Sequence, residues 1–481
     1  MNLVRPLVGL AALALAAGVA APAIGAPAKG KACPAPPKLT YAEPMYVDKT
    51  RAGGEPLVAT HPSGRLMYST HAGTTHFYTP TAGNPGSAAF AQNYQGQTYI
   101  WTSDDDGKTW VFRPRVGGLG SEGGTQGAPG SGFSDPEFAI DSAGAVYFSE
   151  INLANVAVSK SNDRSATYNL QNFFGAVLTD RQWMEADRKN ELYFTANAFG
   201  GGTGTPNSVG DLGHYIAKSK DGGKTFSKNI PNNVGGPGMG DLRVDKRNGT
   251  LYESHFGAGK LSVNAFRNAR KDVLTATDSN LVAESVSMLN SVGPAIDVGP
   301  KGHVYITWDE SGKGDRDEGI YYAYSNNNGR KWSAPIKVSS GDETAIWPWL
   351  AVGDEGRVAI SWLEADTKLP NHNAETPGTH GWRIHAAATL NGLGCKTSKK
   401  PGFSTTIATK TPVHKGTICS SGTTCQAQLV DRRLGDYFSM DIDEKGRAYI
   451  GYSDTQVPAS VSLPGFVRQS GGPVMLAKPK K

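Results

Sequence analysis

The sequence predicts an all-β protein, a seven-bladed β-propeller, from its turn-rich composition, a recurring hairpin pattern and the spacing of its copies. The 481 residues include 60 glycines and 29 prolines. This composition favours many turns joined by short strands over long helices. Net charge is a modest +5, and basic residues do not concentrate in one window with interleaved aromatics, which argues against a nucleic-acid partner.

The recurring pattern is an apolar stretch, a turn containing Gly or Asn, and an alternating β-branched and aromatic strand. Such a pattern is typical of a two-stranded hairpin. Its turn residues are Gly64, Gly144, Asn190, Gly249, Gly302, Gly356 and Gly446. The seven copies span residues 57–70, 138–150, 183–195, 242–254, 295–307, 350–361 and 438–451.

Most turns are about fifty residues apart, which is the spacing of propeller blades. Two longer intervals predict insertions at about 70–98 and 390–435. Because one blade cannot bury both of its faces, the copies should stack around an axis as a single domain over residues 29–478. Residues 41–47 resemble the outer strand of the fifth blade at 332–338, so we expect this N-terminal segment to complete the seventh blade and close the ring.

The first 28 residues predict a signal peptide, with Arg5 before an apolar run and small residues after it. We therefore expect a secreted protein, extracellular or periplasmic, that is monomeric and has no membrane anchor. Export permits disulfides. Cys419 and Cys425 enclose a short loop, which leaves Cys33 and Cys395 as the second pair.

Four copies continue into a second motif. Residues 103–110 (SDDDGKTW) and 219–226 (SKDGGKTF) fit the pattern S-x-D-x-G-x-T-[WF], whereas 161–168 (SNDRSATY) and 325–332 (SNNNGRKW) are degenerate. The chain thereby resembles the Asp-box (BNR-repeat) sialidase-like family. In that family the boxes are structural turns away from the active site. A calcium site over residues 104–106 lacks correctly spaced ligands.

The resemblance to sialidases implies an anion site built from arginines, because a guanidinium offers a forked donor set that matches a carboxylate. Sequence segments that enter the innermost strands carry such residues. The predicted substrate-binding residues are Arg181, Arg432, Arg243, Asp180, Asp436, Glu253 and His255. The alternative is that each Asp-Arg pair only ties a loop to its neighbour.

A glycosidase needs an acid/base carboxyl and usually a nucleophile, which in sialidases is a tyrosine. The predicted catalytic residues are Asp309, Glu310 and Tyr437. No metal or other cofactor is predicted. The Phe-Arg-Ile-Pro motif of sialidases is missing, so a glycan partner is expected without a fixed reaction. The leading hypothesis is an exo-glycosidase that releases a terminal acidic sugar; the alternatives are a non-catalytic glycan- or protein-binding propeller and a polysaccharide lyase.

Overall fold

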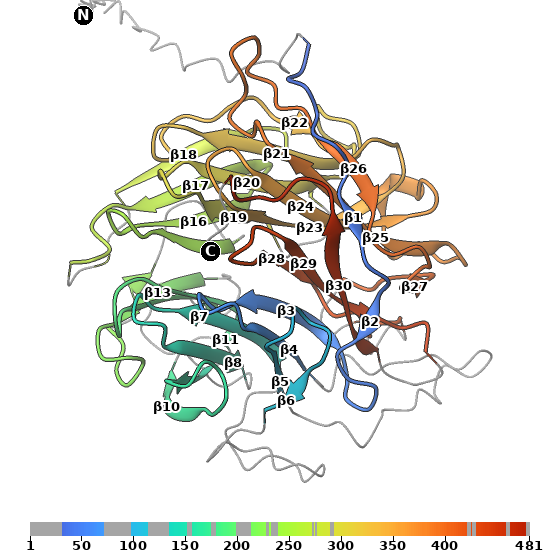
Figure 1. Ribbon diagram of the computed structural model, residues 1–481. Helices are drawn as coiled ribbons and strands as arrows, with labels where there is room; N and C mark the ends of the chain where they lie inside the picture. Colours follow the sequence, from blue (N-terminus) through green and yellow to red (C-terminus); the bar gives the residue numbers. More distant parts are fainter. Residues whose placement is uncertain are drawn as a thin grey trace, which may run out of the picture.

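The computed structural model forms seven antiparallel sheets around one axis, a seven-bladed β-propeller (Figure 1). It describes residues 31–71, 98–113, 134–151, 156–174, 179–198, 213–227, 230–231, 239–271, 274, 277–288, 293–420, 425, 430–457 and 462–477. The expected signal peptide and most of the expected insertion at 70–98 lie outside these ranges. No helix in the described ranges is long and apolar enough to cross a membrane.

The first four blades follow the order of the chain, each from its inner to its outer strand. Blade 1 contains β3 (Gly54–Thr60), β4 (Leu66–His71), β5 (Thr98–Ser103) and β6 (Val111–Phe112). Blade 2 contains β7 (Ser134–Ile140), β8 (Val146–Ile151), β9 (Val156–Ser161) and β10 (Asn169–Phe174). Blade 3 contains β11 (Thr179–Ala186), β12 (Leu192–Ala198), β13 (Gly213–Ser219) and β14 (Ile230–Pro231). Blade 4 contains β15 (Met239–Asp245), β16 (Thr250–Gly257), β17 (Lys260–Phe266) and β18 (Asp278–Ala283).

The last three blades complete the ring. Blade 5 contains β19 (Ala295–Val298), β20 (Val304–Glu310), β21 (Gly319–Ser325) and β22 (Ile336–Lys337). Blade 6 contains β23 (Ala345–Val352), β24 (Val358–Ala365), β25 (Gly381–Thr389), β26 (Ser404–Ile407) and β27 (His414–Lys415), with η3 (Pro370–His372) between β24 and β25. Blade 7 contains β28 (Ser439–Ile442), β29 (Ala448–Asp454) and β30 (Leu463–Gly471), to which β1 (Thr40–Tyr41) and β2 (Met45–Tyr46) are added.

Blade 7 is built from both ends of the chain. β1 and β2 pair antiparallel with β30, so its outer edge consists of N-terminal residues. The inner strand β28 contacts β3 of blade 1, which closes the ring. Part of the predicted insertion at 390–435 forms β26 and β27. Both strands pair with β25, so this part of the insertion belongs to the sheet of blade 6.

The hairpins form where the sequence predicts them. All seven predicted turn residues have left-handed backbones, with φ between 64° and 86°. The second strands are largely buried, and six of them carry a tyrosine that is at most 1% exposed: Tyr68, Tyr147, Tyr193, Tyr252, Tyr305 and Tyr449. Burial of such large side chains makes the stacking of blades the main source of the core.

The four second-motif turns fold alike, including the degenerate ones. In the first, the Ser103 hydroxyl accepts the Gly107 N–H at 2.9 Å, and Asp105 accepts both the N–H and the hydroxyl of Thr109. Residues 161–167 repeat these bonds although Ser165, with φ of 66°, replaces the glycine. A serine can therefore hold this turn, at the cost of an unfavourable backbone region.

Both predicted disulfides are present. Cys33 is bonded to Cys395 with their Cα atoms 6.0 Å apart, and Cys419 to Cys425 with theirs 5.9 Å apart. The first fastens the N-terminal segment to blade 6, and the second closes a short loop before the inner strand of blade 7.

Candidate functional site

An aromatic layer crosses the axis of the propeller. The Trp183 ring of β11 lies 5.5 Å from the Trp349 ring of β23 and 5.5 Å from the Tyr437 ring, which precedes β28. The Tyr437 hydroxyl donates to the Pro136 carbonyl of blade 2 at 3.3 Å. Since all innermost strands run in the same direction, this layer separates residues at the strand starts from residues nearer the hairpin turns.

The strand-start cluster consists of Glu55, Asp135, Arg181, Trp347, Arg432 and Asp436. The first four occupy equivalent positions in blades 1, 2, 3 and 6, and each has a left-handed φ, of 47°, 50°, 54° and 55° respectively. Each lies at a register shift of the inner hairpin. A bulge of this kind re-aims a side chain, at a cost of about 1–3 kcal/mol for a non-glycine residue.

Ion pairs join this cluster across blades 7 and 1. The Arg432 guanidinium, 4% exposed, donates to both oxygens of Asp436 at 2.6 and 2.7 Å and to the Cys419 carbonyl at 3.0 Å. Glu55 accepts the Asp436 N–H at 2.9 Å and lies 3.0 Å from His71 Nε2. Burial alone would lower the pKa of Arg432, but Asp436, then Glu55 and Asp135, raise it above its ordinary value.

This geometry bears on the predicted anion site. Asp436 occupies the forked face of Arg432 that a substrate carboxylate would need. The Arg181 N–H donates to Asp135 at 3.2 Å, so a further carboxylate lies beside the second predicted arginine. Arg181 and Arg432 thus lie near one carboxylate, Asp135, but the cluster has the composition of an internal ion-pair network. The side chain of Asp180 is outside the described part.

The predicted catalytic and binding residues on second strands are fully buried. Glu310 accepts Trp308 Nε1 at 2.8 Å and the Ser287 N–H at 3.0 Å, and it pairs with Arg316 at 2.5 Å. Glu253 accepts the Thr195 hydroxyl and the Asn264 amide, both at 2.9 Å. His255 and Asp309 are 0% exposed. Glu310 and Glu253 thus hold neighbouring segments together. Burial raises the pKa of Tyr437, which precedes β28, well above its usual value.

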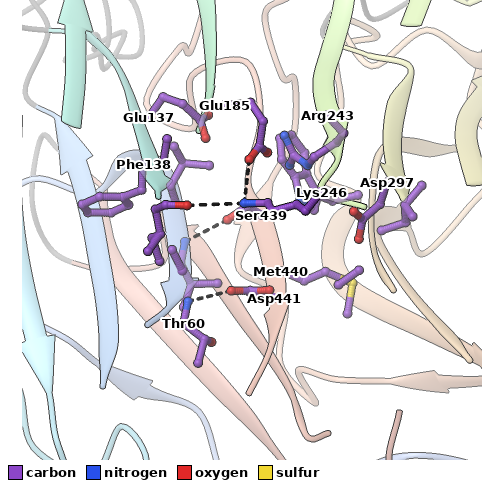
Figure 2. A pocket seen from close by; sticks show the side chains of 18 residues that line it. Thr60, Glu137, Phe138, Glu185, Arg243, Lys246, Asp297, Ser439, Met440 and Asp441 are labelled. Carbon is purple, nitrogen blue, oxygen red and sulfur yellow. Dashed lines mark hydrogen bonds and ion pairs between the residues drawn. The ribbon is translucent and has the colours of Figure 1, made fainter. Parts of the chain in front are cut away.

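A cavity lies on the other side of the aromatic layer, around the axis. Its volume is about 280 Å³. We call it the axial cavity; innermost strands of all seven blades line it, and its lining includes Glu137, Glu185, Arg243, Lys246, Asp297, Trp349 and Asp441. Figure 2 shows the four carboxyl groups around the space, with the Lys246 ammonium group between them.

Three aspartates of this region tie one blade to the next. Asp441 accepts the Thr60 N–H at 2.6 Å, Asp297 the Val352 N–H at 2.9 Å, and Asp241 the Ile296 N–H at 3.4 Å. Burial raises the pKa of Asp441 and of Asp241 to about 6, and it also raises the pKa of Asp297. All three carboxyl groups are structural acceptors, and those of Asp297 and Asp441 line the cavity.

Glu137 differs from those aspartates. It is 6% exposed, and its Oε2 atom has no hydrogen-bond partner among the described residues. Burial raises the pKa of Glu137 well above its ordinary value, and nearby Arg243 offsets only part of that effect. Burial therefore favours the protonated form of Glu137, which belongs to the lining of the axial cavity.

Two cations complete the wall. Arg243 Nη1 donates to Asp241 at 2.7 Å and to the Leu242 carbonyl at 2.8 Å, and its other nitrogens have no acceptor in the described part. Lys246 lies 3.1 Å from Glu185 and donates to the Ala186 carbonyl at 2.9 Å. The lining thus combines carboxyl groups, the cationic donors Arg243 and Lys246, and the aromatic ring of Trp349.

Sequence reasoning selected Arg243 but missed Glu137, Glu185, Asp297 and Asp441. A signal for three of them was present in the repeat. Two residues before the first residue of each inner hairpin turn, three copies carry alanine, at 59, 139 and 351. The other four carry charges, at Glu185, Arg243, Asp297 and Asp441. A charge where other copies place a small apolar residue indicates a polar space at the axis.

Comparison with known proteins gives only distant structural likenesses. No family model matches the chain, and no curated protein matches it. Among solved structures, it is similar to a Dyadobacter fermentans protein of unknown function (15% identity, TM-score 0.43, covering 90% of this chain and 99% of that one). It is also similar to the NanB sialidase of Streptococcus pneumoniae (12% identity, TM-score 0.43, covering 88% of this chain and 70% of that one). A third similar structure is a Penicillium chrysogenum α-L-arabinanase (12% identity, TM-score 0.42, covering 89% of this chain and 98% of that one). At such identities and TM-scores these likenesses transfer no function.

Proposed function

We propose that the protein is an exported glycosidase that takes one terminal sugar residue into the axial cavity. The observation that carries the proposal is Glu137, a buried carboxyl group with a raised pKa and an oxygen that has no hydrogen-bond partner in the described part, in the lining of a cavity of about 280 Å³. This volume lies at the low end of small-molecule sites, which suits a single sugar ring better than a long chain.

Glycoside hydrolysis needs two carboxyl groups in different protonation states. Glu137 would donate its proton to the oxygen of the leaving group. Glu185, paired with Lys246 at 3.1 Å, would act on the anomeric carbon either directly or through a water molecule. The C–O bond breaks, water supplies hydroxyl and proton, and both carboxyl groups return to their starting states.

The remaining lining would position the sugar. The nitrogens of Arg243 that have no acceptor in the described part can donate to ring hydroxyls. Trp349, which closes the cavity toward the aromatic layer, offers an apolar surface for a sugar face. The two disulfides agree with an oxidising location outside the cytoplasm, where such a substrate would be met.

The test is release of free sugar from oligosaccharides that differ in their terminal residue. Glu137→Gln should lower kcat/KM by about 100-fold or more, since that is the usual contribution of a positioned general acid. Its Tm should stay close to that of the wild type because glutamine keeps the shape of a neutral acid. Glu185→Gln should impair turnover similarly.

Glu310→Gln is the matched control, because Glu310 clamps a loop of blade 5. It should lower Tm while leaving turnover per folded molecule intact. If Glu310→Gln abolished turnover and Glu137→Gln did not, the axial cavity would not be the active site. Saturable binding without product would identify a glycan-binding propeller, and an unsaturated uronate among the products would identify a lyase.

A further inference from the structure

The charges around the axial cavity are unequal. Four carboxyl groups line it, those of Glu137, Glu185, Asp297 and Asp441, against two cations, Arg243 and Lys246. Both cations already have carboxylate partners, because Arg243 pairs with Asp241 at 2.7 Å and Lys246 with Glu185 at 3.1 Å. Positive charge at this wall is therefore largely neutralised before any ligand binds.

Asp297 and Asp441 have no cationic side chain in an ion pair within the described ranges. Asp297 is held by the N–H groups of Val298 and Val352, and Asp441 by those of Ile442 and Thr60. Backbone donors stabilise the ionised form without removing its charge. The cavity thus retains a net negative charge around neutral pH, and the low polarity of its surroundings strengthens that field.

We infer that the sugar taken into the axial cavity carries a protonated amino group and not a carboxylate. This inference rests on the proposed function and names its substrate class. An ammonium group has three N–H donors, which the remaining lone pairs of Asp297 and Asp441 in the cavity lining can accept. A sugar carboxylate would instead add a charge of the same sign, and the charge of Arg243 is already balanced by Asp241.

The experiment compares monosaccharides that share one ring and differ in one group. Binding of glucosamine, glucose, N-acetylglucosamine and glucuronate, with their galacto-configured counterparts, is measured by calorimetry at pH 7 on the full chain. In the ring configuration that binds, the free amine should bind about tenfold or more tightly than the uronate. Because salt screens the interaction, this ratio should fall as ionic strength rises.

Two variants test the origin of the preference. Lys246→Gln removes a half-exposed cation from the rim, so it should increase the ratio of amine to uronate affinity severalfold. Asp297→Asn should decrease it. Asp431→Asn, which alters a carboxylate paired with Arg433 before the inner strand of blade 7, should leave the ratio unchanged.

The outcomes separate this inference from the proposed function. The amino-sugar inference is overturned if the uronate binds more tightly than the amine. It is also overturned if the ratio of amine to uronate affinity changes neither with salt nor in Lys246→Gln. In both cases a glycosidase of other specificity remains the proposed function. If none of these sugars binds, the axial cavity is not a sugar site and both proposals fall.

Discussion

The two sides of the aromatic layer use charged residues in opposite ways. In the strand-start cluster, Arg432 and Asp436 make paired hydrogen bonds with each other, and Glu55 accepts a further backbone N–H. At the axial cavity, Glu137 has an oxygen without a partner among the described residues, and the cavity that it helps to line is open. A polar network that satisfies itself stabilises the fold, whereas an incompletely satisfied network next to a cavity is suited to receive a ligand.

The largest expected effect comes from breaking the closed network. Arg432→Met leaves Asp436 as a buried carboxylate without its partner, so we expect a loss of about 3–5 kcal/mol in the free energy of unfolding. Affinity of the remaining folded molecules for the cavity ligand should not change. Denaturant unfolding and calorimetry on the same sample measure both quantities.

Lys410→Met is the control for that change, because Lys410 pairs with Glu43 on the surface, where both side chains are more than three-quarters exposed. It should alter stability by no more than about 0.5 kcal/mol. Loss of affinity in Arg432→Met without loss of stability would instead restore Arg432 as a binding residue and remove the contrast between the two regions.

The next-largest effect tests whether the Asp441 carboxyl group, which lines the axial cavity, titrates as a buried acid. The pKa of Asp441 rises from 3.8 to about 6 on folding, so the folded chain holds this proton more tightly than the unfolded chain. Its contribution to stability therefore falls as pH rises from about 4 to 6. Asp441→Asn should remove this dependence.

The measurement is the difference in unfolding free energy between Asp441→Asn and the wild type at pH 4.5 and at pH 7. The variant should gain about 2 kcal/mol relative to the wild type between the two pH values. An equal difference at both pH values would mean that Asp441 is not buried as a titrating acid.

A smaller effect is expected from the disulfide beside the strand-start cluster. Cys419→Ser with Cys425→Ser opens a loop with a sequence separation of 6, for which chain entropy predicts a cost of about 2 kcal/mol. Because Arg432 donates to the Cys419 carbonyl, the loss should weaken that cluster and spare the cavity. A parallel fall in ligand affinity per folded molecule would show that the two regions are coupled.

Apart from the Lys410→Met control, the smallest effect on stability should come from Lys246→Gln. Lys246 is half-exposed, so losing its pair with Glu185 should cost less than about 1 kcal/mol. Thermal unfolding tests this expectation, and the ligand preference described above should change in the same sample. A large drop in Tm would instead place Lys246 with the structural ion pairs.

Sequence patterns were sufficient for the architecture because they are local and repeated. A glycine or asparagine at each inner turn and an alternating strand after it specify a hairpin from a dozen residues, and seven copies specify the ring. The cysteine pairs also followed, since a short loop fixed one pair and elimination the other. Each of these features depends on residues close in the chain or on simple counting.

The site could be predicted only in part. Arg243 was selected from its place on an inner strand, and it does line the axial cavity. Glu310 and Glu253 were selected because they follow inner hairpin strands, yet both are fully buried with partners from other segments. A carboxylate at such a position can point into the axis or into a blade interface, and local sequence does not distinguish the two.

By itself, then, the sequence determined the seven hairpins, their order around the ring and the pairing of the cysteines. Only the tertiary structure decided which charges are neutralised. Asp436 faces Arg432 within one loop, but Glu137 reaches the same cavity as Arg243, Asp297 and Asp441 because strands of blades 2, 4, 5 and 7 converge on the axis. Burial and charge pairing at the axis depend on residues from all seven blades, and no single stretch of the chain contains all of these residues.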